Sequence, residues 1–356
     1  MIPLSKPFIG EEEKAYVLEV LNSGMLAQGP KVAKLEERFA QLCDVKHAIA
    51  TTSGTTALYV SLLAHGIGYG DEVITTPFTF IASANSILFT GAKPVFVDVD
   101  EKTFNINPEL IEAAISSKTK AIMPVHLYGY VCDMDALQSI ADKHNLIIIE
   151  DACQSVGATY HGKVAGSFGT GAFSLYATKN IMSGEGGMIT TSDDGIAEKC
   201  RMKRNHGMKR RYYHDMLGYN FRMSDLHAAI GLAQIDRLEA FTQVRTRNAQ
   251  FLNENLRTVV TPKVKAGYGH VWHQYTIRLD GGRDRDAAVK KLGDAGVGTG
   301  IFYPVPAHQQ QYMRDLVGDY HLPVAEQLAK EVISLPVHPQ LSQSDLETIV
   351  DEVNKL

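Results

Sequence analysis

The chain has 356 residues, of which 45% are hydrophobic, so it can bury a large core and form one large and one smaller domain. Its formal net charge of −5 argues against a general nucleic-acid-binding protein. No apolar run approaches the roughly 20 residues that cross a bilayer, and the first residues do not resemble a signal peptide, so we expect a soluble cytoplasmic protein without a membrane segment. The four cysteines form no C-x-x-C pair, so neither a disulfide framework nor a metal site is expected.

Short apolar runs separated by segments of helical length predict an α/β fold. The expected strands are residues 48–51, 72–76, 94–98, 121–124 and 146–150. These runs are almost continuously apolar, which is typical of a mostly parallel sheet covered by helices on both faces. Helical spacing of apolar residues appears at residues 32–42 and again after Pro108, a residue type that suits the first position of a helix.

The second half of the sequence predicts one long helix followed by a smaller α+β unit. The helical pattern runs from about Ser224 to Val244. After it we expect a strand and three helices, at residues 274–279, 284–292, 323–331 and 342–353. We therefore predict a large domain over residues 1–240, whose N-terminal segment can pack on the other domain, and a small C-terminal domain over residues 241–356.

The most informative residue is Lys179, which lies in the weakly charged segment S-L-Y-A-T-K-N. Desolvation can remove the proton from such a lysine, and its amine can then form an imine with an aldehyde. Asp151 directly follows a predicted strand, at the carboxyl end where α/β proteins bind ligands, and Gln154 lies in the same turn. A carboxylate there can keep a pyridinium nitrogen charged. Although a single lysine usually lies on the surface and a single Asp often caps a helix, the pair predicts a site for pyridoxal 5′-phosphate (PLP).

A phosphate site is predicted where Ser53-Gly54-Thr55-Thr56 joins a strand to a helix. The free N–H groups of a helix N-terminus attract anions, Gly54 lets the backbone come close, and the hydroxyl of Thr55 can donate a hydrogen bond. An ordinary Ser or Thr helix cap is the alternative. Ser174, five residues before Lys179, supplies a second hydroxyl and favours the phosphate site.

Two further features leave alternatives open. Phe80 follows a predicted strand and could stack on a pyridine ring, although a Phe is more often a core residue, and the same two alternatives apply to Phe78. The lysines and arginines between Lys199 and Arg211 concentrate positive charge, which could bind an anion or simply face water.

Motifs over nearly the whole chain resemble the DegT/DnrJ/StrS family of sugar aminotransferases. They are S-G-T-T-A-L, T-P-F-T-F, E-D-A-C-Q-S-V-G-A, S-L-Y-A-T-K-N, G-E-G-G-M, G-Y-N-F-R-M-S-D-L-H-A-A and Y-P-V-P-A-H. The resemblance implies the PLP-dependent transferase fold type I, in which a mostly parallel sheet of about seven strands lies between helices beside a small α+β domain. It also implies a homodimer with active sites at the subunit interface.

The same resemblance implies a role for each motif residue. Lys179 would be the Schiff-base lysine, Asp151 the partner of the pyridine nitrogen, and Gln154 a second contact to the ring. The remaining cofactor contacts would be Gly54, Thr55 and Ser174 at the phosphate, Phe80 stacked on the ring, and Asn220 reaching the phosphate from the neighbouring subunit. Glu185, Tyr303 and His308 would lie on the substrate side.

A subgroup of the family has His at the lysine position and dehydrates its substrate, so Lys179 favours transamination. We therefore expect an amino-acid donor, with L-glutamate first, and a nucleotide-diphosphate keto sugar as acceptor. The opening I-P-L-S-K-P is more like family members that act on 4-keto sugars. The alternatives are another PLP reaction on the same fold, such as sugar dehydration or transamination of a cyclitol, and a noncatalytic nucleotide-sugar-binding protein.

Overall fold

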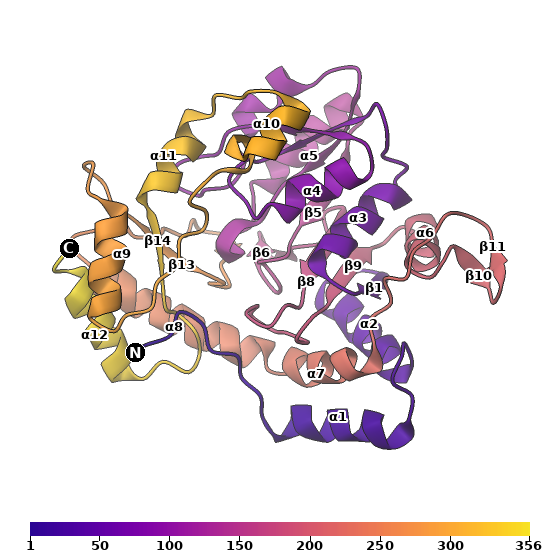
Figure 1. The fold of residues 1–356 in the computed structure, drawn as a ribbon, viewed down its shortest axis with the longest axis horizontal. Coiled ribbons are helices and arrows are strands. Elements are labelled where there is room, and N and C mark those ends of the chain that lie inside the picture. Colours follow the sequence, from indigo (N-terminus) through magenta and orange to yellow (C-terminus); the bar gives the residue numbers. More distant parts are fainter.

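The computed structural model describes residues 1–356 and is built around a seven-stranded sheet (Figure 1). Strand β9 is antiparallel to both neighbours, and the other neighbouring strands are parallel to each other. In spatial order the strands are β1 (His47–Thr51), β9 (Gly187–Thr191), β8 (Thr170–Ser174), β5 (Ile147–Asp151), β4 (Thr119–Met123), β2 (Glu72–Thr75) and β3 (Lys93–Phe96). The mostly parallel sheet predicted from the sequence is therefore present, and every expected strand of this sheet lies within three residues of its predicted ends.

Helices cover both faces of this sheet, as buried parallel strands require. One hydrophobic cluster joins the sheet to α2 (Pro30–Leu42), α5 (Met134–His144) and α7 (Asp225–Ile235). A second cluster lies on the opposite face, against α3 (Gly54–Ala64), α4 (Ala82–Phe89) and α6 (Asp194–Arg204). Helix α1 (Glu11–Ser23) packs outside α7 (Figure 1).

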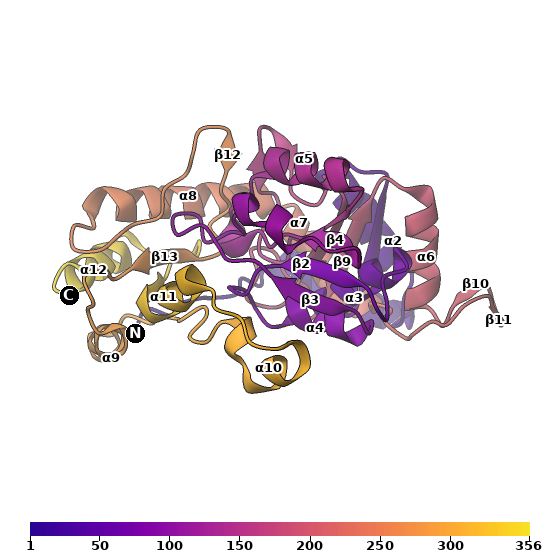
Figure 2. The ribbon, with the colours of Figure 1, turned by 90° about the horizontal axis from the view of Figure 1, so that it is seen from above.

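The C-terminal part forms its own hydrophobic cluster at one end of the molecule (Figure 2). It contains the second half of α8 (Leu238–Asn255) and the antiparallel pair of β13 (Tyr275–Arg278) and β14 (Val332–Leu335), with α9 (Arg285–Asp294) and α12 (Gln343–Val353). The N-terminal segment also joins this end, because Ile2 pairs with Val297. The division that we propose between residues 240 and 241 falls inside α8, whose Leu238 packs in the first sheet cluster and whose Leu252 packs here.

Two helices of the C-terminal part lie against the large sheet. Helix α11 (Pro323–Glu331) packs in a cluster with Phe78, and α10 (Gln311–Val317) packs against Phe96. Between α9 and α10, residues 301–303 pass over the carboxyl ends of the central strands, where they line a cavity. A segment about 150 residues after β5 in the sequence therefore forms part of the cavity wall.

Two sequence predictions differ from the structure, and one strand of the large sheet is absent from the prediction. The single long helix breaks at Asp236 and Arg237 into α7 and α8, where both side chains make ion pairs, with Arg38 and Glu12 respectively. The residues after Pro108 form only two 3₁₀ turns, Pro108–Leu110 and Glu112–Ala114, in place of an α-helix. Strand β8 has the sequence T-G-A-F-S, in which most residues are small and apolar residues do not alternate with polar ones. The sequence therefore gives no strand signal there.

Smaller elements complete the fold. A hairpin of β10 (Met208–Arg210) and β11 (Tyr213–His214) projects from the body next to α6 (Figures 1 and 2). A three-stranded sheet joins β6 (Thr159–Tyr160) to β7 (Lys163–Val164) and β12 (Tyr268–Gly269). None of the helices combines the length and the apolar character needed to cross a bilayer.

Candidate active site

A cavity of about 560 Å³ lies at the carboxyl ends of β4 and β5. The N-terminus of α3, the start of α4, the loop after β8 and residues 301–303 form its walls. This position outside the carboxyl ends of parallel strands is the usual ligand site of α/β folds, and the volume suits a small organic cofactor together with part of a substrate.

Asp151 is held rigidly at the base of this cavity. It is the last residue of β5, only 5% exposed, and its backbone N–H donates to the carbonyl of Pro124 at 2.9 Å. The hydroxyl of Ser83 donates to Asp151 Oδ2 at 2.6 Å, and the N–H of Cys153 donates to Oδ1 at 3.2 Å. The carboxylate is therefore oriented by two donors and remains available to a cationic partner in the cavity.

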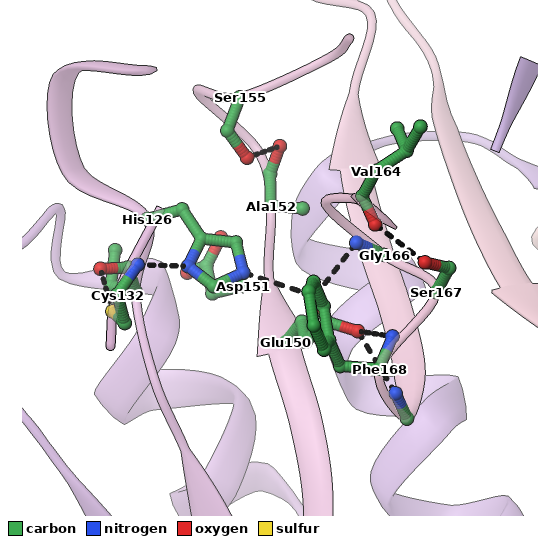
Figure 3. A network of polar contacts seen from close by, with 12 residues as sticks. His126, Cys132, Glu150, Asp151, Ala152, Ser155, Val164, Gly166, Ser167 and Phe168 are labelled. Carbon is green, nitrogen blue, oxygen red and sulfur yellow. Dashed lines mark hydrogen bonds and ion pairs between the residues drawn. The ribbon is translucent and has the colours of Figure 1, made fainter. Parts of the chain in front are cut away.

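A fully buried polar network anchors the strand that carries Asp151 (Figure 3). Glu150 accepts backbone N–H bonds from Gly166, Phe168 and Gly169, at 2.7 to 3.0 Å. His126 Nδ1 accepts the N–H of Cys132 at 3.2 Å, so the ring proton lies on Nε2 and is donated to Glu150 at 3.0 Å. Because every partner is satisfied, this network fixes the end of β5 from the side opposite the cavity.

Lys179 lies in the loop after β8 and lines the same cavity. Burial lowers the pKa of Lys179, because desolvation disfavours its ammonium form, while the negative charge of Asp151 acts in the opposite direction. A larger fraction of this amine is therefore neutral than for an exposed lysine. This is the electronic state that imine chemistry and proton transfer require.

The N-terminus of α3 offers an anion site on the cavity wall. The side chain of Ser53 caps the N–H of Thr56 at 3.1 Å, which leaves the N–H groups of Gly54 and Thr55 without a protein partner. A Cβ atom on Gly54 would lie only 2.8 Å from both Cys153 Sγ and Ser174 Cβ, so the backbone here tolerates no side chain. Unpaired N–H groups at a helix N-terminus, with the hydroxyls of Thr55 and Ser174 beside them, fit a phosphate group.

Aromatic and amide side chains form the rest of the wall. Phe80 lines the cavity and its ring centroid is 6.2 Å from that of Tyr303, whereas Phe78 is fully buried in the core. Gln154 accepts the N–H of Tyr128 at 2.8 Å and donates to the Tyr303 hydroxyl at 3.1 Å. The structure thus separates the two phenylalanines that the sequence could not rank.

Three sequence-predicted features lie elsewhere. His308 is buried beside α11 and contacts Glu326 at 3.1 Å, so it does not line the cavity. Asn220 is exposed and lies next to Asn205, outside the cavity of its own chain. The basic residues between Lys199 and Arg211 do not form one anion site. Arg204 is buried in an ion pair with Glu36, and Lys209 pairs with Glu198 at 2.5 Å.

The sequence does not identify several cavity residues, and two of them, Ser83 and His273, make polar contacts that matter for the site. Ser83 was missed because its contact with Asp151 joins positions 68 residues apart. His273 lines the cavity, and its Nδ1 lies 3.3 Å from Asn180 Oδ1. Burial, with the nearby charges of Lys179 and Arg245, lowers the pKa of His273 well below its usual value, so the ring is neutral. Glu185, which was expected on the substrate side, also lines the cavity.

The family model described as the DegT/DnrJ/EryC1/StrS aminotransferase family matches residues 7–354. The chain belongs to this family. It is 42% identical to GDP-perosamine synthase of Caulobacter vibrioides, over 100% of this chain and 98% of that protein. It is also 42% identical to a UDP-N-acetyl-3-dehydro-alpha-D-glucosamine 3-aminotransferase of Acidithiobacillus ferrooxidans, over 95% and 91% of the two chains.

Solved structures agree with this assignment. The crystal structure of S. venezuelae DesV in complex with a ketimine intermediate matches with a TM-score of 0.94 and 37% identity, over 97% of this chain and 94% of that one. A putative sugar aminotransferase of Streptococcus pneumoniae, 28% identical to this chain over 99% of its length with a TM-score of 0.95, is known in both PLP and PMP forms. The protein is therefore a PLP-dependent aminotransferase, and the predicted fold class, cofactor and reaction type are confirmed. No group of three or more His, Cys, Asp or Glu side chains is arranged to hold a metal ion.

Proposed function

We propose that this aminotransferase moves an amino group from L-glutamate to a nucleotide-linked keto sugar, with a 4-keto-6-deoxyhexose as the expected acceptor, for the biosynthesis of amino sugars. The observation that carries the proposal is the convergence of Lys179, Asp151 and the uncapped N–H groups of α3 on one cavity. The names of the two curated relatives support a nucleotide-linked acceptor. The names of these relatives disfavour a cyclitol acceptor, and Lys179 disfavours dehydration and noncatalytic binding.

The residues present fit PLP, which when bound supplies an electron sink for carbanion chemistry. Asp151 would hold the pyridine nitrogen, and Phe80 would lie against the ring. Gly54, Thr55 and Ser174 would bind the phosphate. Gln154, already fixed by Tyr128, would contact the ring from the other side.

Lys179 carries the proton-transfer chemistry in this proposal. Because burial lowers its pKa, the amine can accept a proton from the donor amino acid and later return one to the sugar. Glu185 and Tyr303 line the cavity beyond Lys179, and we propose that they face the sugar. His308 is the weakest of the proposed substrate residues, because Glu326 already occupies its Nε2.

We further propose a homodimer in which Asn220 reaches the cavity of the second subunit. Asn220 is exposed, and nearby Tyr212, Tyr213 and Leu217 are 73%, 58% and 76% exposed. Exposed apolar side chains grouped on one projecting segment are typical of an interaction surface. The cytoplasmic location expected from the sequence stays a prediction.

The test is a pair of half-reactions with purified protein loaded with PLP. Glutamate alone should yield one equivalent of 2-oxoglutarate per site, and a nucleotide-linked 4-keto-6-deoxyhexose added afterwards should yield an amino sugar with a matching mass. Lys179→Arg should support neither step. Release of 2-oxoglutarate without an amino sugar from either 4-keto or 3-keto acceptors would remove the nucleotide-sugar assignment and keep the transaminase.

A further inference from the structure

A small pocket behind the Lys179 loop contains a buried arginine without an acidic partner. Arg245, on α8, is 6% exposed. Its Nη1 donates to the carbonyl of Trp272 at 3.0 Å, and its buried Nε has no hydrogen-bond partner. Burial lowers the pKa of Arg245 to about 10, so the guanidinium remains charged at neutral pH. A desolvated charge with one neutral acceptor is costly, which indicates that a partner belongs here.

Arg204, the other buried arginine, is paired with a carboxylate, as buried charges usually are. Arg204 is 4% exposed, yet its Nη1 contacts both the carboxylate of Glu36 and the carbonyl of Ala50. Arg278 also has a buried Nε without a hydrogen bond, but that atom lies 3.5 Å from the carboxylate of Glu331. Of these three arginines, only Arg245 has no carboxylate within ion-pair distance.

The pocket beside Arg245 is cationic and has no acidic wall. Its lining includes Arg245, Lys6 and Lys179, and neither Asp nor Glu. Gln234 donates to the carbonyl of Phe8 at 3.0 Å, and Gln340 donates to that of Lys6 at 2.9 Å. These two hydrogen bonds fix the N-terminal segment in place, and this segment forms one wall of the pocket. The pocket is therefore defined by specific contacts within the fold.

The size of the pocket restricts its ligand. Its volume of about 30 Å³ holds one or two water-sized groups, which excludes a phosphate ester or an amino acid. We propose that this Arg245 pocket binds a small monovalent anion of the chloride class. Because Thr178 and Lys179 line both this pocket and the catalytic cavity, the anion would tie the Lys179 loop to α8 and to the N-terminal segment.

The direct test uses bromide, which can be located by its anomalous scattering. Crystals of the wild-type protein soaked in sodium bromide should show a peak inside this pocket, beside the guanidinium group of Arg245 and between Lys6 and Lys179. Electron density for water in the pocket, with no anomalous peak there while bromide binds elsewhere on the surface, would overturn the proposal. This experiment needs no variant and does not depend on the enzyme's substrates.

A solution experiment tests the same site through stability. Urea unfolding is compared in sodium chloride and in sodium gluconate at equal ionic strength, since gluconate is too large for the pocket. Chloride at ten times its dissociation constant should lower the unfolding equilibrium constant about tenfold. Arg245→Met, which removes the charge with a side chain of similar length, should abolish this difference, and Arg278→Met should retain it. An equal chloride effect in wild type and Arg245→Met would contradict the proposal.

Discussion

At the scale of single residues, the orientation of Asp151 depends on Ser83. Ser83→Ala removes the 2.6 Å bond to Asp151 Oδ2, and a hydrogen bond to a charged group contributes about 1.5 kcal/mol or more. We expect kcat/KM to fall about tenfold, which steady-state kinetics would measure. Ser83→Thr keeps the hydroxyl and is the matched control. If both variants fell equally, the loss would come from packing.

Buried histidines make stability depend on pH. Burial lowers the pKa of His65 to about 4 and that of His270 to about 3, from 6.5 in an exposed histidine. Above pH 6.5 neither the folded nor the unfolded chain binds these protons. As the pH falls below 6.5, only the unfolded chain binds them, so the folded state loses stability.

We expect the free energy of unfolding to fall by about 2 kcal/mol for each of these histidines between roughly pH 7 and pH 5. Urea unfolding across this range measures the change. His65→Gln should remove part of the slope while leaving the fold in place. An identical slope in the variant would show that other groups control the pH dependence.

The sequence could predict which residues from local motifs line the cavity. Asp151 ends a strand, Gly54 begins a helix and Lys179 lies in the loop after β8, and in each case the neighbouring residues indicate the position. Ser83 and His273 carry no such local signal, because their partners Asp151 and Asn180 are 68 and 93 positions away. Only the folded chain brings these groups together.

At the scale of elements, Asp225 at the start of α7 caps a different helix. The N-cap of α2 is Gly29, which has no side chain to accept a hydrogen bond. Asp225 Oδ1 accepts the N–H groups of Gly29 and Val32 at 2.8 and 3.0 Å, and Oδ2 accepts that of Lys31 at 3.1 Å. The carboxylate also interacts favourably with the positive end of α2.

Asp225→Ala should therefore leave buried donors unpaired and destabilise the protein by about 3 kcal/mol. Asp225→Asn keeps an acceptor oxygen and should lose less, since only the charge and some of the bonds are removed. Urea unfolding of both variants measures the difference. A loss below about 0.5 kcal/mol in the alanine variant, the range of ordinary surface changes, would contradict this account.

The contact between Asp225 and α2 shows why the packing of one element against another is harder to predict than the elements themselves. Strand β5 and helix α11 follow from short apolar patterns and from the Pro at the first position of α11. Asp225 reads in the sequence as an ordinary residue of the first turn of a helix, and nothing local indicates that it caps α2, which lies almost 200 residues earlier. The residues at the break between α7 and α8 likewise pair with Arg38 and Glu12, which lie about 200 positions earlier in the sequence.

At the scale of the whole molecule, the cavity of one chain lacks Asn220, which lies exposed beside the projecting β10–β11 hairpin. If two chains share their sites, one site takes Lys179 from one subunit and Asn220 from the other. A mixed dimer of Lys179→Ala and Asn220→Ala subunits would then contain one intact site and one site with both defects.

Refolding an equal mixture of the two inactive variants should therefore recover about a quarter of wild-type activity, because half of the dimers are mixed and half of their sites are intact. Each variant refolded alone is the control, and sedimentation velocity checks that dimers form. No recovery from mixed dimers would mean that Asn220 does not complete the partner's site. The exposed aromatic side chains of the hairpin would then need another explanation.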